Sequence, residues 1–315
     1  MNTTTAHTAA MTATLTELSQ EHGFSVERLV RILWTIVCEP GDATAGSLIA
    51  DQGAVAALDL VLGGTCEDVD VVVLRERVLP RLESAEFRQV LATIIEDGHT
   101  VLIPSDDGWP AGLRDLGSRA PFALYVAGDP GLLTRAAPRI LVEGARAATG
   151  YGEHVAMEIT AGLVARGHII VGTGSYGIAG IAHRAALAAG GHTVVVSASG
   201  LGRPFPAGHG DLLTRITERG AIVTELPPHR APTKWTFIQR GRLAAALTDA
   251  VLIVEAGFRS GNLNVAGHAT ALGRPLGAVT GPITSPTSAG CSRLIRDHGA
   301  TLISTTDEAA ALTTP

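Results

Sequence analysis

The chain has 315 residues, enough for two or three domains with substantial cores, and the absence of any run of about 18 apolar residues argues against a membrane span. Its three scattered cysteines form neither a metal-binding spacing nor a disulfide framework, which favours the reducing cytoplasm. The net charge of −6 is uneven: residues 1–130 hold 8 Arg or Lys against 19 Asp or Glu, whereas residues 131–315 hold 16 against 11, so the second part is compatible with polyanion binding.

The first 130 residues suggest three segments. Residues 1–14 are rich in Thr and Ala, carry no Lys or Arg and lack the pattern of a signal peptide, so we expect a flexible tail. Apolar residues at helical spacing, as in Val26–Ile36 and Phe87–Ile95, predict a small helical domain over residues 15–97. Residues 98–130 turn to short strands and turns, which predicts a connecting segment.

From residue 131 to 315, short apolar runs alternate with helical patterns. This alternation predicts an α/β domain with a doubly wound, mainly parallel sheet that binds its ligand at the carboxyl ends of the strands. The predicted strands are Arg139–Glu143, His168–Gly172, Thr193–Ser197, Ala221–Glu225, Ala250–Glu255, Leu276–Thr280 and Ala300–Ser304.

A glycine loop follows the second of these strands. The residues from Gly172 to Gly177 read Gly-x-Gly-x-x-Gly, and an Ala-rich helical pattern begins directly after them. Backbone N–H groups and the helix dipole then converge on one point, which favours a phosphate. A nicotinamide site also requires a carboxylate after the next strand, but Ser197-Ala198-Ser199 stands there. A glycine turn needed only for strand–helix packing is the alternative.

Two other loops should open on the same edge of the sheet. The first strand leads into Gly144–Gly152, where Arg146 is a candidate phosphate clamp, and the Ala250–Glu255 strand leads into Gly257–Asn262. The segment Trp235–Arg242 interleaves aromatic rings with arginines, a pattern suited to a single nucleic-acid strand but also to a helix start with core aromatics.

The sequence makes a poor case for an enzyme. It contains no zinc-protease, nucleophile-elbow or Walker A motif and no paired acid and base, so we predict no catalytic residue, cofactor or metal. His183, on the helix after the glycine loop, is expected to be structural. Glu255 could orient Arg240 or Arg242 as easily as act as a base.

Together these motifs resemble the DNA-processing protein A family (DprA, also called Smf), over about residues 20–312. Gly144-Ala145-Arg146, with Thr149, Tyr151 and Gly152, resembles the family's first loop. The helix from Gly177 through His183 to Leu187 resembles its Gly-Ile-Asp-x-x-Ala-His-x-x-Ala-Leu motif. Further matches are Gly200-Leu201, Phe205-Pro206, Phe237-x-x-Arg240-x-Arg242, Val254-Glu255-Ala256, Ser260-Gly261 and Ser288-Ala289-Gly290-Cys291.

The resemblance implies an extended Rossmann-type domain behind a small helical (SAM-like) domain. It also implies binding of single-stranded DNA without strong sequence preference, a homodimer, and help in loading the recombinase RecA during recombination or natural transformation. The candidate nucleic-acid-binding residues are Gly144, Arg146, Thr149, Gly172, Gly174, Ser175, Tyr176, Gly177, Phe237, Arg240, Arg242, Arg259, Ser260 and Gly261.

The chain also departs from the family pattern. Gly172-Thr173 stands for Ser-Gly, Tyr176 for an arginine, Ala179 for an aspartate, Gly241 for an asparagine and Ser292 for an asparagine. Because the chain ends soon after the last predicted strand, we expect it to lack the C-terminal winged-helix domain of many members. The altered loop keeps two alternatives open, a Rossmann-type sensor of a small nucleotide or phosphorylated nucleoside and a phosphoribohydrolase-like enzyme, although the Pro-Gly-Gly-x-Gly-Thr motif of such enzymes is missing.

Overall fold

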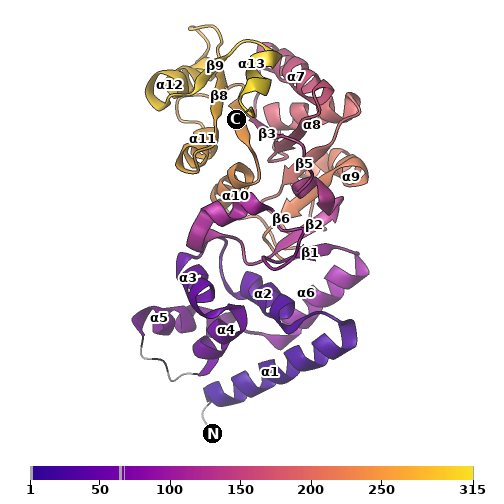
Figure 1. The fold of residues 1–315 in the computed structure, drawn as a ribbon, viewed down its shortest axis with the longest axis vertical. Coiled ribbons are helices and arrows are strands. Elements are labelled where there is room, and N and C mark those ends of the chain that lie inside the picture. Colours follow the sequence, from indigo (N-terminus) through magenta and orange to yellow (C-terminus); the bar gives the residue numbers. More distant parts are fainter. Residues whose placement is uncertain (1–2, 64–65, 67, 315) are drawn as a thin grey trace. The chain divides into compact units, whose positions relative to one another are not determined.

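A computed structural model describes residues 3–63, 66 and 68–314 (Figure 1). The chain divides into two compact units. The helical unit contains the residues up to Trp109 together with Gly117–Tyr125 and Glu225–Pro228, and the sheet unit contains Pro110–Leu116, Val126–Thr224 and the residues from His229 onward. The predicted connecting segment, residues 98–130, is therefore not a body of its own, because its residues are shared between the two units.

The helical unit has the helices that the apolar spacing predicts. They are α1 (Thr3–His22), α2 (Val26–Val37), α3 (Ala43–Gln52), α4 (Ala54–Gly63), α5 (Val69–Val78) and α6 (Ser84–Glu96), followed by strand β1 (Thr100–Leu102). The expected flexible tail is wrong for residues 3–14, which lie in α1; residues 1 and 2 lie outside the described residues. Met11, Leu15 and Leu18 repeat at helical spacing and are buried, so packing offsets the weak helix propensity of the threonines.

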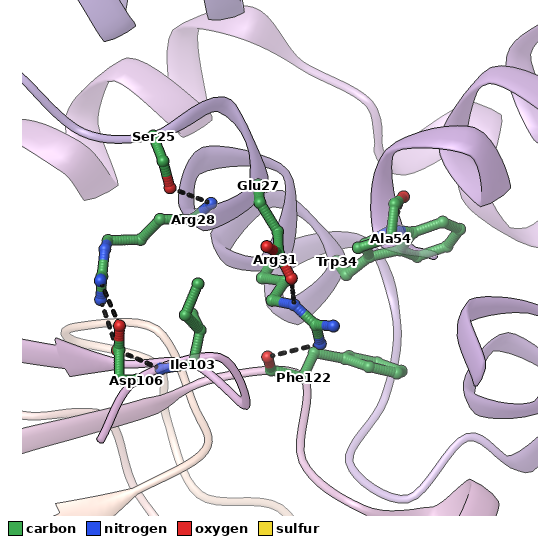
Figure 2. A network of polar contacts seen from close by, with 9 residues as sticks. All are labelled: Ser25, Glu27, Arg28, Arg31, Trp34, Ala54, Ile103, Asp106 and Phe122. Carbon is green, nitrogen blue, oxygen red and sulfur yellow. Dashed lines mark hydrogen bonds and ion pairs between the residues drawn. The ribbon is translucent and has the colours of Figure 1, made fainter. Parts of the chain in front are cut away.

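Helix α2 is tied to its surroundings by polar contacts (Figure 2). Ser25 caps the helix by accepting a hydrogen bond from the Arg28 N–H, and the Arg28 guanidinium donates to both carboxylate oxygens of Asp106, at 2.9 and 2.6 Å. Burial alone would raise the pKa of Asp106, but hydrogen bonds from Arg28 and the Ile103 N–H bring that pKa below its ordinary value. On the opposite side, the buried Trp34 indole donates to the Ala54 carbonyl at 3.1 Å.

The sheet unit confirms all seven strands predicted after residue 138, each within two residues at either end. They are β3 (Arg139–Glu143), β4 (Ile169–Gly172), β5 (Thr193–Val196), β6 (Ala221–Thr224), β7 (Ala250–Ile253), β8 (Leu276–Val279) and β9 (Thr301–Ile303). The helices between and after them are α7 (Gly150–Ala165), α8 (Ile178–Ala188), α9 (Gly210–Arg219), α10 (Lys234–Ala246), α11 (Asn262–Ala271), α12 (Ala289–His298) and α13 (Thr306–Ala311). Strand β2 (Leu124–Gly128) spans the division between the units, and short 3-10 turns occupy Leu79–Arg81, Ala111–Arg119, Pro130–Leu133, Ala207–His209 and Pro286–Ser288.

These seven strands are parallel and lie in the order β6-β5-β4-β3-β7-β8-β9. Figure 1 shows α7, α8 and α9 on one side of the strands and α10, α11 and α12 on the other. Both faces of the sheet are therefore covered, which explains why the strands are apolar on both sides, as in the fully buried β4 and β7.

The chain leaves the paired strands β3 and β7 in opposite directions. After β3 it runs through α7 to β4, and after β7 it runs through α11 to β8. The two loops diverge at the carboxyl edge of the sheet, which is the place where such folds form a ligand crevice.

None of the single helices that the structure describes is both long and apolar enough to cross a bilayer, although the sharply bent pair α3 and α4 meets these criteria when the two are taken together.

Candidate nucleic-acid interface

A pocket of about 720 Å³ lies at this divergence of the loops. Its walls come from the loop after β3, from Thr173 of the glycine loop, from α10 and from the start of α11. The lining includes the cations Arg146, Lys234 and Arg240; among the described lining residues there is no carboxylate, histidine or cysteine. The electrostatics therefore favour an anionic ligand.

The exposed Arg146 and the half-buried Phe237 form one wall of this pocket. The Arg146 guanidinium carbon lies 5.6 Å from the centre of the Phe237 ring, and that of Arg240 lies 5.1 Å from it. Phe205 contacts the same ring edge-on at 5.2 Å between centroids. Two cations and an aromatic partner thus gather on one phenyl ring, an arrangement stabilised by cation–π attraction.

The glycine loop packs directly against the loop that carries Arg146. Gly177 has φ +72°, and a Cβ placed there would overlap the carbonyl oxygens of Ala145 and Arg146. The Ile178 N–H donates to the Ala145 carbonyl at 3.1 Å. Within the described part of the chain, the N–H groups of Ser175, Tyr176 and Gly177 donate to no other residue, so the positive end of α8 offers free donors beside Arg146.

Tyr176 of the glycine loop contacts the segment before α9. The residue is 47% exposed, and its ring contacts the His209 ring at 4.7 Å between centroids, while His209 Nδ1 lies 3.0 Å from the Gly174 carbonyl oxygen. An exposed aromatic face therefore stands where the family pattern has an arginine.

Arg240 is buried, and its guanidinium donates hydrogen bonds to the glycine loop. It is 8% exposed, and its guanidinium donates to the Thr173 carbonyl at 2.9 Å and to Ser175 Oγ at 3.3 Å. Burial lowers its pKa to about 10, so it is still a cation at neutral pH. Arg240 thus contributes positive charge to the pocket and also holds the glycine loop in place.

Glu255 orients the loop after β3; the sequence had left open whether it orients the arginines of α10 or acts as a base. Its carboxylate accepts hydrogen bonds from the Thr149 N–H at 3.0 Å, from Thr149 Oγ1 at 2.5 Å and from Thr287 Oγ1 at 3.0 Å. Thr149 in turn caps α7 by accepting from the Gly152 N–H. A Cβ on Gly152 would overlap the Glu255 carboxylate, which explains the glycine there.

The structure brings most of the predicted residues to this edge, but not all of them line the pocket. Arg146, Phe237, Arg240, Ser260 and Gly261 do so. Gly144, Thr149, Gly172, Gly174, Ser175, Tyr176 and Gly177 build or flank its loops, whereas Arg259 is exposed outside the lining and Arg242, 2% exposed, lies in the interior. Residues not predicted as site residues include Glu143, Thr173, Lys234, Asn262 and Asn264. Lys234 directly precedes the predicted segment Trp235–Arg242 and Asn262 ends the predicted loop Gly257–Asn262, which was the available signal.

His183 supports the glycine loop from below. It is fully buried, its Nδ1 lies 2.7 Å from Thr193 Oγ1, and a Cβ on Gly172 would lie 2.7 Å from its Nε2. This close approach explains why residue 172 is a glycine. His183 therefore has a structural role, which is to pack against the end of β4, where the glycine loop begins. Burial, helped by the charges of His209 and Arg184, lowers the pKa of His183 to about 3.

This neutral histidine predicts acid sensitivity. The unfolded chain binds a proton at this histidine below a pKa of about 6.5, whereas the folded chain does so only below a pKa of about 3. Between these two values, each pH unit of acidification therefore lowers the free energy of unfolding by up to about 1.4 kcal/mol. Above the window its contribution is constant. Denaturant unfolding of the wild type and of His183→Gln between pH 4 and 6 should show a shallower decline for the variant; equal slopes would contradict the assignment.

Comparison with known proteins agrees with this geometry. The family model described as DNA recombination-mediator protein A matches residues 100–313. A DprA-type DNA processing protein of Mycobacterium tuberculosis is 42% identical over 283 residues, covering 86% of this chain and 71% of the relative, and the DprA of Bacillus subtilis is 30% identical over 70% of this chain and 73% of its own length.

Two solved structures are similar as well. The DprA structure from Streptococcus pneumoniae superposes with a TM-score of 0.76 at 25% identity, covering 91% of this chain and 98% of that one. The DNA processing protein A of Helicobacter pylori, whose structure is described in terms of its single-stranded DNA binding mode, has a TM-score of 0.61 at 26% identity, covering 67% and 94%. The resemblance found in the sequence is thereby confirmed, and the chain belongs to the DprA/Smf family of DNA-processing proteins.

Proposed function

We propose that this chain binds single-stranded DNA at the pocket and along the adjoining glycine loop. The observation that carries the proposal is the position of Arg146. Its loop contacts Gly177 of the glycine loop, and its guanidinium lies over Phe237 at the pocket wall. A backbone phosphate at Arg146 would therefore be within the field of Arg240 and Lys234 and beside the free N–H groups of the loop.

Exposed aromatic rings supply the other half of the interface. Tyr176, Phe205 and Trp235 are 47%, 38% and 43% exposed, and they belong to the glycine loop, the segment before α9 and the first turn of α10. Every base has a face that can stack on such a ring, so this surface supports binding without strong sequence preference.

We propose binding rather than catalysis. The ionisable side chains among the described residues that line the pocket are Arg146, Lys234 and Arg240, a set that suits the neutralisation of a bound phosphate. The two buried carboxylates nearby, Glu143 and Glu255, both accept hydrogen bonds from the loops.

The remaining expectations extend this proposal. The family description as a recombination mediator supports delivery of the bound strand to RecA, in recombination or in DNA uptake. We also propose the homodimer that the family resemblance implies. The three thiols are free, in keeping with action in the cytoplasm. Light scattering and co-purification with RecA test these points.

The direct test is fluorescence anisotropy with a labelled dT oligomer over a series of salt concentrations. We expect saturable binding. The logarithm of the association constant should fall linearly with the logarithm of the salt concentration, with a slope of about −0.7 for each phosphate neutralised. A large excess of unlabelled dTMP should compete poorly, because one nucleotide offers only part of the surface. A flat salt response, or tight competition by dTMP, would favour a small-nucleotide sensor instead.

A further inference from the structure

A buried carboxylate lies beneath the glycine loop. Glu143, the last residue of β3, is 1% exposed and is not among the residues that line the pocket. Its Oε1 accepts a hydrogen bond from the Thr173 N–H at 2.7 Å. A ligand in the pocket cannot touch this carboxylate, so its influence on binding must pass through the groups that it holds.

Thr173 connects Glu143 to Arg240. The Thr173 N–H donates to Glu143, while its carbonyl oxygen accepts from the Arg240 guanidinium at 2.9 Å. Arg240 also donates to Ser175 Oγ, which lies 3.0 Å from Thr173 Oγ1. Thr173 is thus held between a buried carboxyl group and a buried guanidinium.

The charges of this pair oppose each other. Burial lowers the pKa of Arg240 and raises that of Glu143, and in both cases the partner's charge counters the effect of burial. Arg146 acts on Arg240 in the opposite sense, because two cations close together repel. At Arg240, the charge of Glu143 thus acts against the repulsion from Arg146.

We propose that Glu143 is a built-in counter-charge that weakens the grip of Arg240 on a DNA phosphate and so keeps the strand releasable. The inference rests on the proposed function, since a phosphate in the pocket would meet the guanidinium that Thr173 links to Glu143. Glu143 is then a positioning residue, because it acts only through Thr173 and Arg240.

The test is Glu143→Gln, which keeps the size and an oxygen that can accept from the Thr173 N–H but removes the charge. With the labelled dT oligomer at about 0.1 M salt we expect about fivefold tighter binding and a salt slope steeper by about 0.7, the effect of one more phosphate contact. Glu218→Gln is the matched control. This exposed residue on α9 precedes β6 and so lies at the amino edge of the sheet, opposite the pocket; it should leave both values unchanged.

Two further variants keep the inference falsifiable. Glu143→Asp retains the charge and should keep the wild-type slope even where the shorter side chain loosens the loop. In an Arg240→Gln background, Glu143→Gln should no longer tighten binding. If Glu143→Gln binds with the wild-type affinity and an unchanged salt slope, or if it binds more weakly than the wild type, the counter-charge proposal is wrong. Failure of the wild type to bind DNA at all would instead contradict the proposed function.

Discussion

Replacing Gly177 by alanine is expected to cost about 3 kcal/mol of unfolding free energy and to abolish DNA binding. Gly177 has φ +72°, which alanine tolerates poorly, and the added methyl group would overlap the carbonyl oxygens of Ala145 and Arg146. The clash would separate the glycine loop from the loop that carries Arg146. Denaturant unfolding measures the first effect and anisotropy with the dT oligomer the second.

Gly167→Ala is the matched control. Gly167 has φ +83°, but a Cβ added to it would meet nothing within 4 Å, so the substitution carries only the backbone strain of about 1 to 2 kcal/mol. It should leave DNA binding at the wild-type level. Equal stability losses in the two variants would show that the contact between the loops contributes nothing.

Arg146→Ala is expected to weaken binding of the dT oligomer by at least about tenfold and to reduce the salt slope by about 0.7. The side chain is exposed, so its loss should change the unfolding free energy by no more than about 0.5 kcal/mol. The large effect on affinity and the small effect on stability together distinguish a ligand contact from a structural residue.

Arg219→Ala is a suitable comparison for that variant. Arg219 is an exposed arginine at the end of α9, next to the amino end of β6 and so away from the carboxyl edge of the sheet. Its removal takes the same charge from the sheet unit but should change the affinity by less than about twofold at moderate salt, because an exposed charge beyond a Debye length is largely screened. Equal losses for both arginines would mean that binding is diffuse and that the pocket is not the site.

The strands of the sheet unit could be predicted because they are buried on both faces. Ile140, Leu141 and Val142 of β3 are 0% exposed, and such continuous apolar runs stand out from the amphipathic helices around them. The loops that follow the strands then meet at one edge by topology alone, which is why Arg146 and Ser260 could be placed together without any knowledge of contacts.

The motif Arg240-x-Arg242 shows where a linear pattern fails. Residues two apart on a helix point about 200° apart, so both cannot face one pocket. Arg240 lines it, while Arg242 enters the interior. The spacing alone contained this information, but the resemblance to a family motif treated the two arginines as one unit.

Glu143 and α1 were missed for different reasons. A carboxylate at the end of an apolar strand is expected to reach solvent, and only the packed loop shows that Glu143 is covered and paired. In α1 the signal was present, as Met11, Leu15 and Leu18 recur at helical spacing, but the surrounding threonines, which are weak helix formers, concealed it.

Whether a DNA strand lies along the glycine loop and the pocket can be read directly by photocrosslinking. The full chain is crosslinked to an oligonucleotide that carries 5-iododeoxyuridine, and the modified peptides are mapped. We expect crosslinks to Phe237, whose ring lies against Arg146, and to the exposed Tyr176 of the glycine loop, and we expect their loss in Arg146→Ala. Crosslinks confined to the helical unit, or a wild-type pattern in Arg146→Ala, would contradict binding at this site.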